Sequence, residues 1–283
     1  AIEAVLVEEQ PDAVLVYGDT NSTLAGALAA AKLHIPVAHV EAGLRSFNRR
    51  MPEEINRVLT DHVSTWLFPP SDKAMEHLRN EGISHDKVVN CGDVMYDAAL
   101  TFGEQARRTS TICEDLELEE KGFRLSTIHR QENTDDPVRL RVVLEVLAEL
   151  TEESPLVLPM HPRTRSRCEA TPELAPLLSN IKVVEPVGFF DVIRLQQAAK
   201  TVITDSGGMQ KEAFFHGTPV IILRDETEWP ELIDLGWARL EPPLQTQQVL
   251  DGITDFEGRP REAKGSPYGD GNAAIKIIEN LLK

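Results

Sequence analysis

Apolar positions along the chain alternate between short continuous runs and longer stretches with helical spacing. Residues 12–17 and 35–40 have the pattern of buried strands, and the alanine-rich residues 20–33 between them have that of a helix. Short apolar runs separated by helical stretches are typical of parallel strands with covering helices. The beginning of the chain therefore predicts a βαβ unit.

The same alternation recurs twice further along. Residues 124–128 and 155–160 read as strands around the helical residues 137–151, and residues 201–204, 209–216 and 219–223 again read as strand, helix, strand. The polar segment 100–122 interrupts the series and is expected to contain a domain junction. We predict an α/β protein with two parallel sheets and helices on both faces, in domains over residues 1–105 and 106–266. Residues 267–283 read as a turn and an amphipathic terminal helix.

The first ten residues read as an amphipathic helix, with neither the basic start nor the apolar run of a signal or transit peptide. A doubly wound sheet normally opens with a strand and a glycine-containing turn. We therefore expect the first domain to be incomplete at its beginning.

Composition narrows the classes of partner. The formal charge of -17 disfavours nucleic acid, and no apolar stretch approaches the roughly 20 residues of a membrane span. The three cysteines form no CxxC pair, which fits reduced thiols in a cytoplasm. No Walker, GxSxG or GxGxxG string is present and no His/Asp/Glu set has metal-ligand spacing, so neither a metal nor a nicotinamide cofactor is expected.

Polar residues cluster directly after the predicted strands, where ligands bind in parallel α/β sheets. Asp19, Glu41, Glu53 and His129 are the acid–base candidates. Ordinary explanations stay open: Asp19 as a cap of the helix that starts at Thr20, and Glu53 as a first-turn acid. Glu41 is harder to explain in this way, because it ends a buried strand.

The run 204–212 (TDSGGMQKE) places Ser206, Gly207 and Gly208 immediately before a helix. Glycines let an anion approach the backbone, and the N–H groups and dipole of a helix N-terminus attract it. Glu212 lies one turn further along the same helix face, where its carboxylate suits ribose hydroxyls. A capping role for Asp205 is the structural alternative. Cations available to a diphosphate are Arg45, Arg57, Arg130, Arg163, Arg165, Lys211 and Arg224, each equally compatible with a surface charge.

Several long strings carry a family resemblance. GDTNSTLAGALAAAKLHIPVAHVEAGLRS, MPEEINR, HRQEN, TDSGGMQKEAFFHGTPVIILRDETEWPE and YGDGNAA resemble, in this order, the non-hydrolysing UDP-N-acetylglucosamine 2-epimerases. The resemblance implies two Rossmann-like domains in a GT-B arrangement, with the UDP-sugar between them and the terminal helix returning to the first domain. It also implies a homodimer.

The resemblance further implies a reaction at C2 of the sugar. UDP leaves C1 as the C2 proton is removed, giving a 2-acetamidoglucal, and UDP then adds back with protonation on the opposite face. Asp19, Glu41, Glu53 and His129 match the family's catalytic residues. The matched substrate-binding residues and further candidates are Arg45, Arg57, Arg130, His161, Ser206, Gly207, Gly208, Glu212 and Arg224.

The chain departs from the family pattern at two places. A strand with a GTRPE loop ordinarily opens the family and does not appear here. The chain also has His161-Pro162-Arg163-Thr164 where many bacterial members carry an HxNP loop linked to allosteric activation. The HPRT variant is similar to that of relatives that act on UDP-2,3-diacetamido-glucuronic acid.

Other functions remain open at the level of sequence. A hydrolysing epimerase would release UDP and N-acetylmannosamine, and a glycosyltransferase would share the architecture. A non-catalytic nucleotide-sugar binding module is the alternative outside enzymes.

Overall fold

The structure is a computed structural model that describes residues 1–261 and 265–283. The chain divides into two compact units, Ala1–Asp97 with Ser266–Lys283, and Ala98–Gly265. The division falls within α5 (Val94–Thr109), a few residues before the polar segment 100–122 in which the sequence predicted a junction. Each unit is built on its own parallel sheet.

The first unit contains a three-stranded sheet in the order β1-β2-β3. Its strands pair parallel throughout, and β2 lies in the centre. The bounds of its elements are α1 (Ile2–Glu9), β1 (Val14–Tyr17), α2 (Asn21–Lys32), β2 (Val37–Val40), α3 (Pro52–Val63), β3 (Trp66–Phe68), α4 (Asp72–Asn80), η1 (His85–Lys87) and α14 (Ala273–Leu281).

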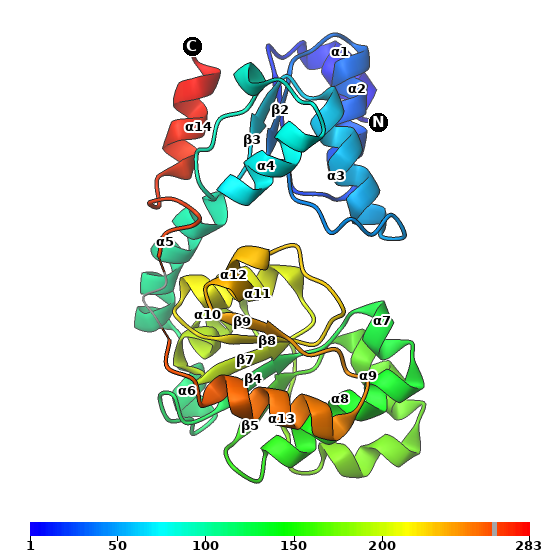
Figure 1. The fold of residues 1–283 in the computed structure, drawn as a ribbon, viewed down its shortest axis with the longest axis vertical. Coiled ribbons are helices and arrows are strands. Elements are labelled where there is room, and N and C mark those ends of the chain that lie inside the picture. Colours follow the sequence, from blue (N-terminus) through cyan, green and yellow to red (C-terminus); the bar gives the residue numbers. More distant parts are fainter. Residues whose placement is uncertain (262–264) are drawn as a thin grey trace. The chain divides into compact units, whose positions relative to one another are not determined.

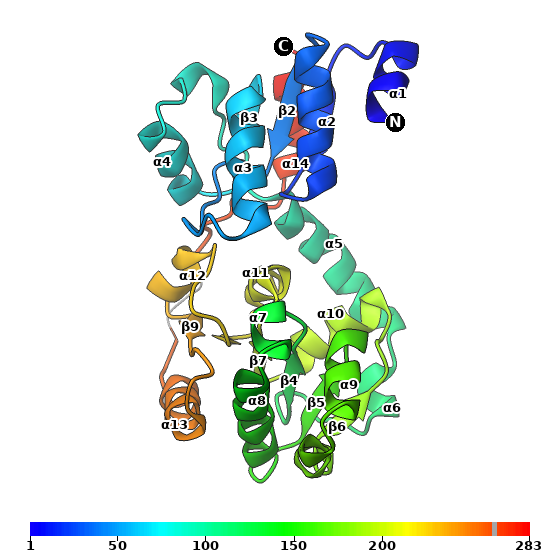
Figure 2. The same ribbon diagram turned by 90° about the vertical axis from the view of Figure 1, so that its right-hand side faces the viewer.

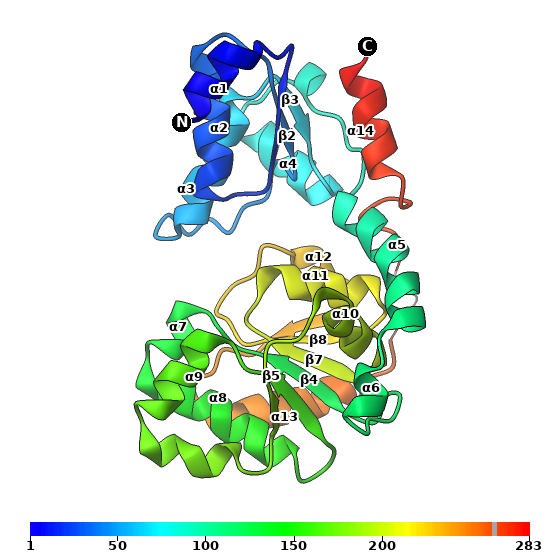
Figure 3. The ribbon, with the colours of Figure 1, turned by 180° about the vertical axis from the view of Figure 1, so that it is seen from behind.

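Alternate residues of β2 face opposite layers of this unit. Val37 packs with alanines of α2, whereas Ala38 and Val40 pack with Ile277 of α14. Figures 2 and 3 show α2 and α3 on one face of the sheet and α14 on the other. Because side chains alternate along a strand, the central strand is buried on both sides, and this explains its continuous apolar pattern.

The second unit contains a six-stranded parallel sheet in the order β6-β5-β4-β7-β8-β9. Its strands are β4 (Arg124–Thr127), β5 (Leu156–Pro159), β6 (Lys182–Val184), β7 (Thr201–Thr204), β8 (Val220–Ile222) and β9 (Ala238–Leu240). Its remaining elements are α6 (Ile112–Asp115), α7 (Gln131–Thr134), α8 (Pro137–Leu150), α9 (Pro162–Glu169), η2 (Pro172–Leu178), α10 (Phe189–Ala198), α11 (Gly207–Phe215), α12 (Pro230–Asp234) and α13 (Thr246–Glu257).

Strands β4 and β7 are neighbours in this sheet although more than 70 residues separate Thr127 from its partner Thr204. The chain runs outward from β4 in one direction and returns to start again at β7, which is the strand order of a dinucleotide-binding fold. Ligands of such sheets bind beyond the carboxyl ends of the strands at this switch point. His129 follows β4 there, and Asp205 follows β7.

Helices cover both faces of this second sheet as well. Side chains of α8 and α13 join those of β5, β7 and β8 in one buried cluster. Figures 1 and 3 show α8 and α13 on one face and α10 and α11 on the other. The predicted class, α/β with parallel sheets covered on both faces, is confirmed.

Candidate active site

Three carboxylates of the first unit gather at the carboxyl end of its sheet. Asp19 lies in the loop after β1, Glu41 directly follows β2, and Glu53 lies in the first turn of α3. Burial raises the pKa of Asp19, Arg57 opposes the rise, and the charges of Glu41 and Glu53 add to it. Glu41 and Glu53 are therefore both within electrostatic reach of Asp19, an arrangement suited to acid–base chemistry.

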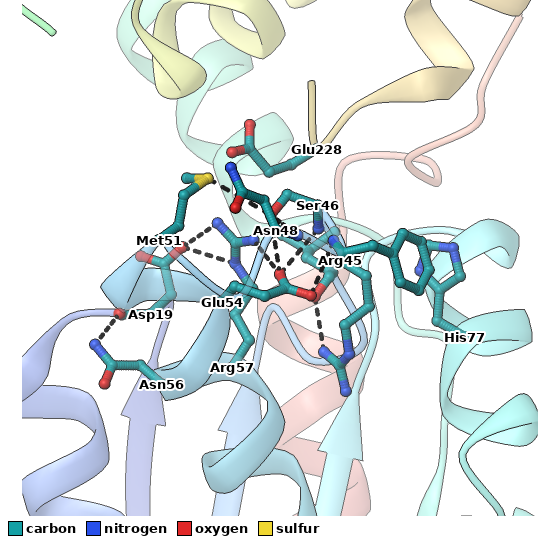
Figure 4. A network of polar contacts seen from close by, with 12 residues as sticks. Asp19, Arg45, Ser46, Asn48, Met51, Glu54, Asn56, Arg57, His77 and Glu228 are labelled. Atoms are coloured by element: carbon teal, nitrogen blue, oxygen red, sulfur yellow. Dashed lines mark hydrogen bonds and ion pairs between the residues drawn. The ribbon is translucent and has the colours of Figure 1, made fainter. Parts of the chain in front are cut away.

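Arg57 of α3 joins Asp19 to a second carboxylate, Glu54 (Figure 4). Its Nε and Nη2 lie 3.0 and 2.9 Å from Asp19 Oδ2, and its Nη1 lies 2.8 Å from Glu54 Oε2. Asn56 also donates to the Asp19 carbonyl over 2.9 Å. The side chain of Asp19 is thus held by α3, which also carries Glu53. Thr20, and not Asp19, provides the side-chain cap of α2.

Glu54 fixes the loop that follows Glu41. Its carboxylate accepts from the backbone N–H of Ser46 at 2.9 Å and of Phe47 at 3.0 Å. The side chain is almost fully buried. Adjacent acids at the start of α3 therefore differ in surroundings: Glu53 lies near Asp19, and Glu54 anchors a loop.

Glu41 has a left-handed backbone, with φ at 73°. A residue other than glycine rarely adopts this region, and such strain is concentrated at functional sites. Its carboxylate lies beside the loop that follows β1. Glu41 Oε2 would be 3.3 Å from a methyl group placed on Gly18 of that loop.

Arg45 does not join this carboxylate cluster. Its guanidinium is buried and bound by Asp61 at 2.8 Å and by Glu81 at 2.7 Å. It also donates to the carbonyl of Leu44. Because these bonds hold the guanidinium in the interior of the unit, its observed partners are carboxylates of the protein and do not support the diphosphate contact expected from sequence.

In the second unit, α11 begins with the Ser206-Gly207-Gly208 turn. The Ser206 hydroxyl caps the helix by accepting from Met209 N. A methyl group on Gly207 would lie 3.6 Å from both Arg130 Nη2 and Glu228 Oε2 and 4.0 Å from Arg224 Nη1, whereas one on Gly208 would meet nothing within 4 Å. Open space at the helix N-terminus, with two guanidinium groups near the same turn, is suited to an anion.

Arg224 is held in place by a carboxylate. It forms a two-bond pair with Glu228 at 2.9 and 3.0 Å, and both side chains are almost fully buried. Trp229, the next residue, donates from Nε1 to the Gly207 carbonyl at 3.0 Å. The segment after β8 is therefore bound directly to the glycine turn.

Asp205 organises the switch point and was not identified from sequence beyond a possible cap. It is fully buried and accepts from the backbone N–H of His129 at 3.0 Å and of Arg130 at 3.1 Å. Asn133 donates to the same carboxylate at 3.1 Å. One side chain after β7 thus fixes the loop after β4. The position of Asp205 at a strand end marked it as a candidate site residue, but the sequence could not reveal its partners, which lie more than 70 residues away.

His129 and His161 lie side by side at the ends of β4 and β5, with ring centroids 5.4 Å apart. Burial lowers the pKa of His129, opposed by Asp205 and reinforced by His161, Arg130 and Arg163. His161 caps α9 by accepting from Arg163 N at its own Nδ1. Its remaining ring nitrogen is therefore the one that carries the proton in the neutral form.

Glu212 lies on α11 one turn beyond the glycines. Its carboxylate accepts from Gln196 Nε2 at 3.0 Å. Burial raises the pKa of Glu212, and the bond from Gln196 and the charge of Lys211 oppose that rise. The remaining acceptor capacity suits hydroxyl donors.

Comparison with known proteins gives a family for this arrangement. The family model described as UDP-N-acetylglucosamine 2-epimerase matches residues 1–282. The chain belongs to the UDP-N-acetylglucosamine 2-epimerase family. The resemblance seen in the sequence motifs is thereby confirmed.

Relatives within the 2-epimerase family match along almost the whole chain. The UDP-2,3-diacetamido-2,3-dideoxy-D-glucuronate 2-epimerase of Pseudomonas aeruginosa is 48% identical over 285 residues, which cover 100% of this chain and 78% of the relative. The crystal structure of the Methanocaldococcus jannaschii UDP-GlcNAc 2-epimerase in complex with UDP-GlcNAc and UDP matches with a TM-score of 0.91 and 40% identity, over 99% of this chain and 78% of the other.

A further family member has been solved with a sugar nucleotide. The Neisseria meningitidis UDP-GlcNAc 2-epimerase bound to UDP-GlcNAc matches with a TM-score of 0.87 and 33% identity, covering 99% of this chain and 79% of the other. In the present protein, no group of three or more His, Cys, Asp and Glu side chains among the described residues is arranged to hold a metal ion. None of the helices described is long and apolar enough to cross a membrane.

Proposed function

We propose that the protein inverts C2 of a UDP-2-acetamido sugar, converting UDP-GlcNAc to UDP-ManNAc by elimination and re-addition of UDP. The observation that carries this proposal is the gathering of Asp19, Glu41 and Glu53 at one sheet end in a member of the 2-epimerase family. In the elimination, a carboxylate takes the C2 proton and the C1–O bond breaks, giving 2-acetamidoglucal and UDP. Re-addition of UDP at C1 with protonation of C2 from the opposite face inverts that carbon.

The carboxylate cluster supplies the basicity that this reaction needs. The C2 proton is only weakly acidic, and a buried carboxylate is a stronger base than one in water. Burial is the leading cause of the raised pKa of Asp19. Two neighbouring carboxylates allow one group to accept the proton while another, protonated, delivers one to the other face.

The second unit is assigned to UDP. The Ser206-Gly207-Gly208 turn receives the diphosphate, with Arg130 and Arg224 as its counter-charges. Glu212 accepts from the ribose hydroxyls. His129 is assigned to donate a hydrogen bond to the departing phosphate, and the bond from its backbone N–H to Asp205 supports this assignment by fixing the loop that carries it. Arg57 is assigned to Asp19, and His161 to the same phosphate region as His129.

A second substrate is favoured by a specific observation. The relative that is 48% identical over the whole chain is named for UDP-2,3-diacetamido-2,3-dideoxy-D-glucuronate. That sugar also carries the 2-acetamido group, so the C2 chemistry is unchanged. The second candidate is therefore the same inversion on this uronate.

Turnover in deuterated water tests both the reaction and the substrate. The protein is incubated separately with UDP-GlcNAc and with the diacetamido uronate, and products are followed by proton NMR. A UDP-sugar that is inverted and deuterated at C2 is expected for at least one of them. Release of free N-acetylmannosamine with UDP would show hydrolysis instead, and UDP binding without C2 exchange on either sugar would contradict the proposal.

A further inference from the structure

His39 is buried in the first unit with both ring nitrogens engaged. It is fully buried in the centre of β2, where its Nδ1 lies 2.6 Å from Asp61 Oδ1 and its Nε2 lies 2.9 Å from the Gly18 carbonyl oxygen. A carbonyl oxygen only accepts, so Nε2 carries a hydrogen. An ionised carboxylate also only accepts, so Nδ1 carries one too when Asp61 is ionised. The ring is then an imidazolium.

The surrounding charges favour that ionised pair. Burial alone would lower the pKa of His39, but the bond to Asp61, the Gly18 carbonyl and the charges of Asp61 and Glu41 together raise it. Burial alone would raise the pKa of Asp61, but His39 and Arg45 hold it below its ordinary value. Arg45 is in turn paired with Glu81 on α4's C-terminal side. The charged groups that face the pair are therefore Glu41, Arg45 and, beyond it, Glu81.

The pair contacts both loops that carry the C2 carboxylates. His39 binds the carbonyl of Gly18, the residue directly before Asp19. Asp61 Oδ2 accepts from Gly43 N at 3.1 Å, two residues after Glu41. His39 itself lies on β2, two residues before Glu41, which directly follows that strand. One buried ion pair therefore connects the backbones on either side of the carboxylate cluster.

We propose that the His39–Asp61 pair is a positioning device for proton transfer at C2. It fixes the backbone of the loops that carry Asp19 and Glu41, and it holds a protonated ring within electrostatic reach of Glu41. Both side chains are buried, so neither is assigned a contact with substrate. The inference rests on the proposed function, because it assigns the loops their role in that reaction.

The variant Asp61→Asn tests the charge of the pair while leaving the shape of the side chain nearly unchanged. The amide keeps nearly the same volume and a polar contact to His39, but it removes the carboxylate that keeps the ring protonated. We expect His39 of the variant to be neutral above about pH 6.5, the ordinary midpoint of a histidine, because burial lowers its pKa once the carboxylate is gone. With the ring neutral, kcat should fall by about tenfold or more relative to wild type, with KM changed by less than about threefold, because acid–base positioning contributes to the chemical step.

Nitrogen NMR of the labelled ring reads the same event directly. Wild-type His39 is expected to show two protonated nitrogens up to about pH 8, and the variant a single one at the top of the range. A purely structural role would reduce the folded fraction without introducing this new ionisation in kcat. Glu81→Gln is the matched control: it removes an ion pair on the other side of Arg45 and should introduce no new ionisation.

The double variant His39→Gln with Asp61→Asn keeps the inference testable if the single variant does not fold. Glutamine can donate to Gly18 and accept from asparagine, so the pair is complementary but neutral. Its kcat should be about tenfold or more below that of wild type, and it should show no ionisation from residue 39. Wild-type kcat in this variant, a neutral wild-type ring, or an Asp61→Asn profile that follows wild type would each overturn the inference. Absence of C2 exchange in the wild type would instead refute the proposed function, and with it the catalytic part of the inference. The NMR spectrum would still establish the protonation state of the His39–Asp61 pair.

Discussion

At the scale of single residues, the left-handed backbone of Glu41 allows two substitutions at this position to differ in stability while both abolish activity. A non-glycine residue at φ 73° costs about 1–2 kcal/mol. Glu41→Gly relieves that strain but adds freedom to the unfolded chain, whereas Glu41→Gln keeps the strain. We expect both variants to lose C2 exchange, and the glycine variant to be the more stable of the two by roughly 1 kcal/mol. Denaturant unfolding and deuterium incorporation measure the two effects. A glycine variant less stable than the glutamine variant would show that the backbone is not strained.

The neighbouring acids of α3 form a second comparison at this scale. Glu54 accepts from Arg57 and from two backbone N–H groups, so Glu54→Gln leaves buried donors poorly paired. We expect a loss of about 2–3 kcal/mol in the free energy of unfolding. Glu53→Gln should cost at most about 1 kcal/mol, the value of a first-turn acid, while abolishing exchange. Thermal unfolding and NMR exchange distinguish the two. Equal destabilisation by both substitutions would contradict these separate assignments.

At the scale of elements, the N-terminus of α11 is expected to bind anions through open space rather than through side chains. A methyl group on Gly208 meets no atom of the protein within 4 Å. Gly208→Ala should therefore leave the free protein as stable or raise its stability by up to about 1 kcal/mol, because alanine is the better helix former. The same methyl group would occupy the approach to the helix N–H groups, so UDP affinity should fall by about tenfold or more. Calorimetric titration and unfolding of the ligand-free protein measure both. Unchanged UDP affinity would place the diphosphate elsewhere.

The elements that could be predicted from sequence were those with their own local pattern. The strand over residues 201–204 and the helix over 137–151 agree closely with β7 and α8. The three-residue strand β3 was not predicted, because so short an apolar run is equally compatible with a helix or loop.

Contacts between residues far apart in the chain could not be predicted from the sequence. Asp205 is joined to Asn133 over 72 residues, and His39 to Asp61 over 22. The spacing of residues in the chain does not encode such contacts, so a strand-end position identified candidates without revealing what holds them.

At the scale of the whole molecule, the charge of -17 opposes the approach of a nucleotide that is itself negative. The positive groups near the glycine turn act over a few ångströms, whereas the net charge acts over the screening length. That length is about 30 Å at 0.01 M salt and about 10 Å at 0.1 M. Added salt should thus weaken the general repulsion more than the local attraction.

We therefore expect the association constant for UDP to rise as sodium chloride increases from about 0.01 to about 0.1 M, opposite to the usual trend for an anion bound by arginines. Uridine carries no phosphate, and its affinity should be nearly independent of salt. Calorimetric titrations of both ligands across this range make the comparison. A steady fall in UDP affinity would mean that Arg130 and Arg224 dominate the field at the site in spite of the acidic surface.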